Sequence, residues 1–221
     1  MRQGNSTVLD HPARVTTDVH GAILDMARGQ HVLNVGAAGN ATHYRDHGSD
    51  EWLHARLARV SATLVGLDLD AAEVRVAAGL GFDVRVGNCE TKNLKTHFDV
   101  IVMADVLEHV DGPASALANM MAHLNPGGKI IITTPNATFF GNFANALLRR
   151  GPKVYWDHVN LYAPETIQAM CDRHGWTLAQ TNLYSLVDRR NASVRMKSRL
   201  IGFLARLFPR LHSGFMCVIG T

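Results

Sequence analysis

The chain has 221 residues and a formal net charge of only +3. Hydrophobic residues make up 47% of it and charged residues 19%, a balance that can bury a full core and excludes a disordered or fibrous protein. The length fits one domain over residues 1–221 and leaves no room for a separate substrate domain.

The excess of positive charge lies at the C-terminal end. Seven arginine and lysine residues follow Asp188, and no acidic residue lies among or after them. A solvated basic helix face explains such a segment, and contact with a phosphate-bearing partner or an anionic membrane surface is the alternative. Because no signature of a nucleic-acid-binding module accompanies it, we expect no nucleic-acid partner.

Cysteine usage and hydropathy bear on the compartment. Cys89, Cys171 and Cys217 are odd in number, far apart and without CxxC spacing, so neither a disulfide framework nor a thiolate zinc site is indicated. The first residues lack an apolar signal stretch, and no run approaches the ~20 apolar residues of a membrane span. We therefore expect a cytoplasmic protein.

Short apolar runs rich in valine and isoleucine alternate with helical patterns up to Pro135. The predicted strands cover residues 31–35, 63–67, 83–86, 98–103 and 129–133, and the predicted helices cover residues 42–60, 70–78 and 113–124. This alternation is typical of parallel βαβ units. The expected fold is a doubly wound α/β sheet with helices on both faces.

The pattern changes after Pro135. A glycine- and asparagine-containing stretch covers residues 136–151, and Pro164 introduces a helix. Two more strands are predicted over residues 177–184 and 214–219, with a helical pattern over residues 193–208 between them. We expect a cofactor half over about residues 20–135 and acceptor-side elements over about residues 136–221.

The first predicted strand runs directly into a small-residue turn in VLNVGAAGN, residues 32–40. Gly36 and Gly39 can adopt backbone angles that are closed to other residues, while Ala37 and Ala38 keep the surface low enough for a ligand to approach the main chain. The segment is typical of a nucleotide-binding turn, although glycine at such a joint also serves packing alone.

A carboxylate ends the second predicted strand, in the sequence LVGLDLD. Asp68 at this position can accept hydrogen bonds from both hydroxyls of a ribose. The alternative role, capping of the next helix, suits Asp70 better, because Asp70 directly precedes AAEVRV.

The next three predicted strands point to the same edge of the sheet. The third runs into GNCE, where Asn88 can pair with the rim of an adenine ring, and the fourth lies in HFDVIVMADVLEHV. The fifth, KIIITTPN, follows a tight turn at residues 126–128. Sheets of this type bind ligands at the carboxyl ends of their strands.

This ordered set of motifs resembles the class I S-adenosylmethionine-dependent methyltransferases, in particular small bacterial enzymes related to the ubiquinone-biosynthesis O-methyltransferases. The resemblance covers about residues 32–176. It implies a Rossmann-like, mostly parallel seven-stranded sheet with an antiparallel strand near residues 214–219, and S-adenosyl-L-methionine bound across the strand ends. The residues that it implies for cofactor binding are Asn34, Gly36, Ala37, Gly39, Asp68, Leu69, Asn88, Cys89, Glu90, Ala104 and Asp105.

Two features depart from the family pattern. Many members have an acidic residue in place of Asn34 and a glycine in place of Ala38, so we expect the Asn34 amide and backbone groups to hold the methionine end of the cofactor. The stretch between Gly39 and Asp68 is also longer than the ~20 residues usual in a dinucleotide fold, and it carries DEWLHARLARV.

Two other functions remain open. A nicotinamide-dependent oxidoreductase would start its G-x-G-x-x-G turn at Gly36, but Ala38 and Ala41 occupy the other two glycine positions. A sulfonium cofactor has no pyrophosphate and tolerates this looser turn. A non-catalytic nucleotide-binding module is favoured if no polar group reaches the methyl position.

Two histidines are candidates for a catalytic base. His109 lies in LEHV and His158 in YWDHVNLYAPE. We predict His158 as the base, because aromatic residues surround it in the sequence, with Asp157 to orient it and His109 as the second candidate. Packing beneath the cofactor explains His109 equally well, and Glu108 beside it is expected to project in another direction.

The histidine content invites a metal hypothesis. The chain has 12 histidines, but it has no HExxH motif and no repeated ligand spacing, so no metal site is expected. His43, His47 and His54 are predicted as helix and loop residues at the surface.

The expected reaction is an in-line displacement at a carbon activated by positive sulfur, for which positioning supplies much of the barrier reduction. We expect a small-molecule acceptor methylated on oxygen, with a sugar, glycan or secondary-metabolite hydroxyl first and an amine or a quinone-like phenol as alternatives. Packing on the sheet explains the apolar stripe in residues 200–208, and a lid or attachment to a membrane that carries a lipid-linked acceptor is the alternative. No oligomeric state is indicated.

Overall fold

The computed structural model describes residues 2–3, 6–152, 154–185, 196, 203 and 207–221. The strands are β1 (Arg2–Gln3), β2 (Ser6–Thr7), β3 (Arg14–Val15), β4 (His31–Val35), β5 (Thr63–Asp68), β6 (Val84–Val86), β7 (Phe98–Ala104), β8 (Leu124–Pro135), β9 (Thr177–Tyr184) and β10 (Gly214–Gly220). The helices are α1 (Val19–Ala27), α2 (Ala41–His47), α3 (Leu53–Ala58), α4 (Ala71–Gly79), the 3₁₀ turn η1 (Leu107–His109), α5 (Pro113–Met121), α6 (Phe140–Leu147), α7 (Pro164–His174) and the 3₁₀ turn η2 (Pro209–Leu211).

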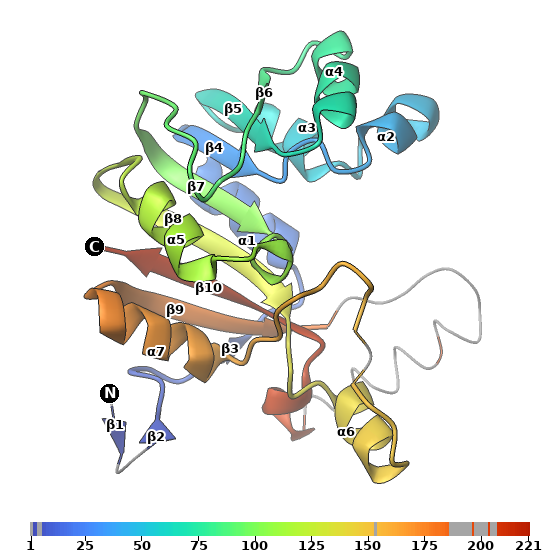
Figure 1. Cartoon of the computed structure of the whole chain (residues 1–221), viewed down its shortest axis with the longest axis vertical. Coiled ribbons are helices and arrows are strands. Elements are labelled where there is room, and N and C mark those ends of the chain that lie inside the picture. Colours follow the sequence, from blue (N-terminus) through green and yellow to red (C-terminus); the bar gives the residue numbers. More distant parts are fainter. Residues whose placement is uncertain (1, 4–5, 153, 186–195, 197–202, 204–206) are drawn as a thin grey trace.

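One mixed sheet organises the molecule, with the strand order β3-β9-β10-β8-β7-β4-β5-β6 (Figure 1). Strands β8, β7, β4, β5 and β6 pair in parallel, whereas β10 runs antiparallel to β8 and to β9. The predicted doubly wound class and the antiparallel strand are therefore confirmed. The sheet has eight strands in place of the expected seven, because the short β3 pairs with the outer edge of β9.

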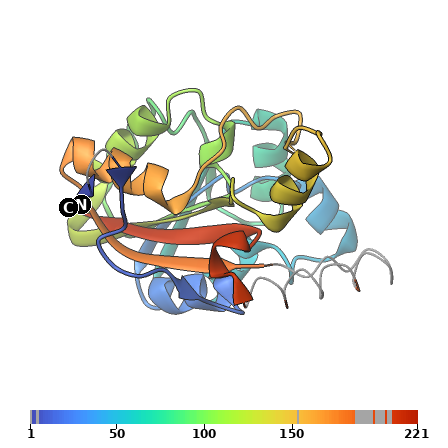
Figure 2. The same cartoon turned by 90° about the horizontal axis from the view of Figure 1, so that it is seen from below.

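Helices cover both faces of this sheet (Figure 2). On one face Ile23 of α1 and Leu57 of α3 pack against Val100 and Val102 of β7. On the other face the helices α5 and α7 form a larger core with the sheet, to which Leu117 contributes. The central strands are buried on both faces, which explains why they read as unbroken apolar runs in the sequence.

Several predicted elements match the structure closely. The strand over residues 31–35 and the strand over residues 177–184 have the predicted bounds. Asp70 is the N-cap of α4, since its carboxylate accepts from the backbone N–H groups of Ala72 at 2.8 Å and Glu73 at 3.2 Å. The predicted capping role of Asp70 is confirmed, which leaves Asp68 available for another role.

Other predictions were wrong. The single helix predicted over residues 42–60 is two helices, because Gly48 adopts a φ of 96° and ends α2 before α3 begins. The helix predicted over residues 113–124 ends at Met121, and Leu124 already belongs to β8. The helices α1 and α6 were not predicted. Most of the helical pattern predicted over residues 193–208 lies outside the described residues.

Within the part of the chain that the structure describes, no helix is both long enough and apolar enough to cross a membrane.

Candidate functional site

A pocket of about 330 Å³ opens at the carboxyl ends of β4, β5, β6 and β7. Four turns meet there, and each supplies part of the wall. The wall comprises Val35, Gly36, Gly39, Leu67, Asp68, Leu69, Gly87, Asn88, Cys89, Glu90, Ala104, Asp105, Val106, His109, Val110 and Asp111. All the predicted cofactor residues except Asn34 and Ala37 are in this set, although their contact with a cofactor stays a prediction.

The glycine turn after β4 approaches its neighbours too closely for a side chain at its first position. Gly36 has a φ of 71°, and a Cβ atom there would lie 2.7 Å from a methyl carbon of Val106. Its backbone N–H donates to the carbonyl oxygen of Leu67 at 2.8 Å, which holds the turn against the end of β5. Glycine at position 36 is therefore required by both conformation and space.

Asp68 links this turn to the next one. Its Oδ2 atom accepts from the backbone N–H of Ala38 at 2.8 Å, and its Oδ1 atom accepts from the backbone N–H of Asp70 at 3.0 Å. A carboxylate has about four acceptor sites, so both oxygens can still accept from ribose hydroxyls. The side chain thus fixes two turns and lines the pocket at the same time.

The segment that lengthens the chain between Gly39 and Asp68 forms a floor beneath the glycine turn. The indole Nε1 of Trp52 donates to the carbonyl oxygen of Ala37 at 3.0 Å. The Nδ2 of Asn34 donates to Nδ1 of His54 at 3.2 Å. This segment was left without a role in the sequence, and the structure shows that it supports the turn from the side opposite to the pocket.

The structure places three predicted residues differently at this floor. Asn34 is only 3% exposed and its amide is engaged by His54, so it does not face the pocket as a holder of the methionine end. Ala37 is 1% exposed and packs with Trp52. His54 is 1% exposed and not at the surface as predicted, because its ring fits against Gly66, which has no Cβ atom in the way.

Burial also sets the protonation of His54. Loss of hydration lowers the pKa of His54 from 6.5 to about 4, so the ring is neutral at physiological pH. A neutral ring whose Nδ1 accepts from an amide is compatible with Asn34, whereas the acidic residue common in the family would need a proton on that nitrogen. Asn34 and His54 are thus matched to each other.

The opposite end of the pocket lies at the end of β7. Asp105 has a φ of 51°, an unusual conformation for a residue other than glycine, and its Oδ1 accepts from the hydroxyl of Thr133 at 3.0 Å. Burial raises the pKa of the Asp105 carboxyl above its ordinary value. The left-handed backbone and the raised pKa of Asp105 both indicate a position kept for function.

Two loops bring the candidate bases together beside Asp105. The rings of His109 and His158 lie 4.6 Å apart, centre to centre, and are nearly perpendicular. The Nδ1 of His109 lies 3.1 Å from the carbonyl oxygen and 3.4 Å from the Oδ2 of Asp157. Asp157 therefore orients His109, not His158 as predicted. His109 lines the pocket, whereas His158 contacts the ring of His109 and is not among the lining residues.

Glu108 completes this group, although the sequence predicts that it projects in another direction. It is 2% exposed, and neither carboxylate oxygen has a hydrogen-bond partner among the described residues. Burial, followed by the charge of Asp105, raises the pKa of Glu108 from 4.5 to about 7. A buried carboxyl with a raised pKa therefore lies close to the two histidines.

Three of these side chains converge closely. Glu108, His109 and His158 each place one donor atom within 4.8 Å of the others, close enough to share a proton or a cation. No motif spacing could reveal the group, because His158 is brought to η1 by a separate loop. The backbone N–H of Val159 donates to the carbonyl oxygen of Glu108 at 2.9 Å and fixes that loop.

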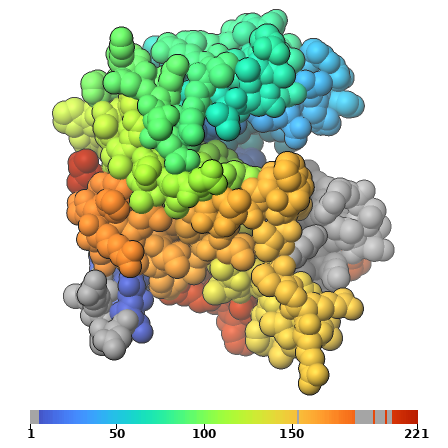
Figure 3. Space-filling model, viewed as in Figure 1, coloured from blue at the N-terminus to red at the C-terminus, as the bar shows by residue number. Residues whose placement is uncertain are grey.

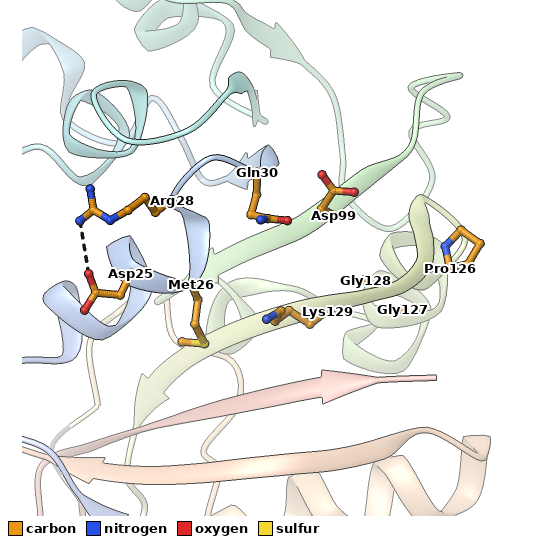
Figure 4. A pocket seen from close by; sticks show the side chains of 9 residues that line it. All are labelled: Asp25, Met26, Arg28, Gln30, Asp99, Pro126, Gly127, Gly128 and Lys129. Atoms are coloured by element: carbon orange, nitrogen blue, oxygen red, sulfur yellow. Dashed lines mark hydrogen bonds and ion pairs between the residues drawn. The ribbon is translucent and has the colours of Figure 1, made fainter.

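A second hollow, of about 600 Å³, is wider but lies at the amino ends of the strands (Figure 4). Three of its charged groups already have partners. Asp25 pairs with Arg28, and Asp99 accepts from the backbone N–H of His31 and from Asn125. Ligands of α/β sheets bind at the other end of the strands, so this hollow is not the candidate site.

Comparison with known proteins agrees with this geometry. Residues 24–181 match the family of methyltransferase domains. A ubiquinone biosynthesis O-methyltransferase from Nitrosococcus oceani is 31% identical over 160 residues, which cover 66% of this chain and 63% of that protein. The chain spans between about half and two thirds of the length of the first curated relatives that it matches.

Solved structures share the fold at low sequence identity. A methyltransferase dependent on S-adenosylmethionine from Archaeoglobus fulgidus superposes with a TM-score of 0.60 at 14% identity. The superposition covers 91% of this chain and 90% of the Archaeoglobus fulgidus chain. The N-methyltransferase NodS from Bradyrhizobium japonicum, in complex with S-adenosylhomocysteine, superposes with a TM-score of 0.56 at 16% identity. The superposition covers 90% of this chain and 84% of the NodS chain. These likenesses concern the fold alone.

The floor under the glycine turn generates one prediction. Trp52→Phe removes the N–H donor to Ala37 and keeps an aromatic ring, so the carbonyl group loses its partner at a cost of about 1–3 kcal/mol. We expect weaker binding of S-adenosylhomocysteine by calorimetry, together with lower stability. Trp176→Phe is the control, because it changes a partly buried tryptophan away from the turn and should leave affinity unchanged. Equal affinity in the two variants would contradict the role of Trp52.

Glu108 generates a second prediction, on pH and stability. Because the folded pKa of about 7 exceeds 4.5, the folded state keeps a proton that the unfolded state releases, and Glu108 lowers the free energy of unfolding progressively between pH 4.5 and pH 7. Glu108→Gln should abolish this loss, which amounts to about 3 kcal/mol above pH 7. Urea denaturation across this pH range, with Glu51→Gln as an exposed control, measures it. A stability difference independent of pH would contradict the assignment.

Proposed function

Because the chain belongs to the family of methyltransferase domains, we propose that it transfers the methyl group of S-adenosyl-L-methionine to a small-molecule acceptor beside Asp105 and His109. One observation carries the proposal. The glycine turn and Asp68 converge on one end of a pocket whose other end holds an acid–base group. Polar groups therefore reach the methyl position, which argues against a purely nucleotide-binding module.

S-adenosyl-L-methionine is the cofactor of this family, and the pocket fits its parts. Asp68 would accept from the ribose hydroxyls, and Leu69, which is 72% exposed, would pack on the adenosyl group. Asn88 lies at the adenine side, where its own Oδ1 accepts from the backbone N–H of Glu90 at 2.8 Å. The bound cofactor supplies a methyl group on positive sulfur, and the chain supplies position and proton transfer.

We infer that His109 is the base that takes the proton of the acceptor. A carbonyl oxygen can only accept, so the contact with Asp157 places the proton of a neutral His109 ring on Nδ1 and leaves Nε2 as the basic nitrogen. Burial lowers the pKa of the neighbouring His158, which keeps a second positive charge away from His109. His158 then acts as the packing partner of the base.

The acceptor that suits this base is a hydroxyl of moderate acidity. A phenol with a pKa near 10 loses its proton to a histidine more readily than a sugar hydroxyl does. The relative from Nitrosococcus oceani is named as an O-methyltransferase of ubiquinone biosynthesis. We therefore place a quinone-like phenol ahead of the sugar or glycan hydroxyl expected from the sequence, and an amine after both.

Two further expectations, the division of the chain and its compartment, belong to this proposal. The division into a cofactor half and an acceptor side over residues 136–221 follows the position of the pocket. The three cysteines are free and buried, which supports a reducing compartment such as the cytoplasm.

The cofactor assignment is tested at Asp68. Asp68→Ala removes a charged hydrogen-bond partner and should weaken binding of S-adenosylhomocysteine by about 1–3 kcal/mol in calorimetry. Asp70→Ala is the matched control, since it removes a helix cap and should lower stability by about 1 kcal/mol without a comparable loss of affinity. Binding of NAD in place of S-adenosylhomocysteine would overturn the proposal.

The base is tested by replacing each histidine. His109→Ala should lower kcat for a phenolic acceptor by about 10²–10⁴-fold and affect cofactor affinity much less, while His158→Ala should have a smaller effect. His43→Ala, an exposed change on α2, is the control. Full activity of His109→Ala would dismiss it as the base. Loss of wild-type activity on chelation, restored by a divalent cation, would assign the group to a cation instead.

A further inference from the structure

Eight of the sixteen exposed large hydrophobic residues of the described chain lie between β8 and α7. We define the docking surface as the exposed side chains of Phe143, Leu147, Leu148, Arg149, Arg150, Tyr155, Trp156 and Val159. Leu147 is 69% exposed, Leu148 64%, Val159 60% and Trp156 95%. Trp156 therefore has almost no contact with the rest of the described chain.

The helix within the docking surface is little covered by the rest of the described chain. The eight residues of α6 include Phe140, Phe143 and Leu147, yet none of the eight is buried. Isolated helices of this length are marginal in water, and most helices are stabilised by packing of their apolar face. Figure 1 and Figure 3 show that α6 projects from the body of the molecule.

The charge of this region selects the partner. Residues 112–156 contain no aspartate or glutamate, and Arg149 and Arg150 stand exposed at the end of α6. The acidic residues that follow next in the sequence are engaged, since Asp157 contacts His109 and Glu165 pairs with Arg210. Tryptophan, tyrosine and leucine beside uncompensated arginines are typical of a surface that lies in the headgroup layer of an anionic membrane.

A groove next to α6 fits a lipid chain. It has a volume of about 420 Å³ and is lined mainly by apolar groups, among them Ala137, Phe143, Ala146 and Leu211. Arg150 lies on the same wall, where it can meet a phosphate above an inserted acyl chain. A flat contact with another protein would not require a basic group at the mouth of an apolar groove.

We propose that the docking surface attaches the protein to the face of an anionic bilayer without crossing it. Trp156 and the apolar face of α6 enter the headgroup layer, and Arg149 and Arg150 contact lipid phosphates. Trp156 directly precedes Asp157, which contacts His109, so attachment turns the acceptor side of the site toward the bilayer. The attachment is independent of the proposed reaction, because it requires neither cofactor nor acceptor.

Vesicle sedimentation tests the charge requirement. The full chain should sediment with phosphatidylcholine vesicles that contain phosphatidylglycerol and not with phosphatidylcholine alone. Arg150→Glu should weaken the anionic binding about 30-fold, since each charge near the surface is worth about fivefold and a reversal changes two. Arg75→Glu, the same change at an exposed position of α4, should leave at least most of the binding in place.

Fluorescence tests the insertion. Trp52 is 3% exposed and Trp176 is partly buried, so an emission shift to shorter wavelength on addition of anionic vesicles should come from Trp156 and vanish in Trp156→Phe. Trp156→Ser should lower vesicle affinity, whereas Leu80→Ser, an exposed leucine after α4, should not. Unchanged S-adenosylhomocysteine binding in Trp156→Ser shows that the variant folds.

Three results would overturn the proposal. Failure of the wild-type chain to sediment with anionic vesicles would mean that another part of this chain or another protein covers the surface. A concentration-dependent dimer that Trp156→Ser abolishes would assign the surface to a second copy. Binding unaffected by Arg150→Glu and Trp156→Ser would place the attachment elsewhere.

Discussion

The hydrogen bond from the backbone N–H of Ala38 to the carboxylate of Asp68, at 2.8 Å, is the interaction on which the site depends. It joins the turn after β4 to the turn after β5, two segments that approach each other only because their strands are parallel neighbours. The same carboxylate lines the pocket. A single side chain thus couples the shape of the glycine turn to the place where a ribose is expected.

Desolvation differs between the two ends of the pocket. Beneath the glycine turn, burial keeps His54 neutral and paired with Asn34, so this pair carries no charge. At the other end, Glu108 and Asp105 are acids whose pKa values burial raises. Glu108 is buried without a hydrogen-bond partner among the described residues, which is costly to the folded state and is the usual sign of a group kept for chemistry.

Local sequence signals were sufficient to predict most strands of the sheet and part of the candidate site. Apolar runs between small-residue turns located β4 and β9 to the residue, and the strand that ends in LVGLDLD placed Asp68 at the correct edge. Those signals lie within a few residues of the feature that they predict. The rule that ligands bind at the carboxyl ends of parallel strands supplied the rest.

What was missed depends on contacts between distant segments. The pairing of Asp157 with His109, in place of His158, follows from a loop that returns 48 residues later, and sequence adjacency favoured the wrong partner. The burial of His54 depends on a glycine of β5 that leaves space for its ring. Helix α6 was missed because its glycine and asparagine content suggested irregular structure. None of its residues is buried among the described residues, so it also lacks the pattern of a core helix.

The antiparallel course of β10 has a consequence for how such enzymes can change. Pro135 at the end of β8, Tyr184 at the end of β9 and Gly214 at the start of β10 lie side by side in register. Residues 136–162 therefore leave this edge of the sheet and return to it at the Asn136–Tyr162 bridge, and Ser185 contacts His212 at 2.9 Å where the chain leaves β9 and where it enters β10. Either connection can be lengthened, shortened or exchanged with that of a related enzyme while the strands keep their pairing, so a new acceptor requires no new scaffold.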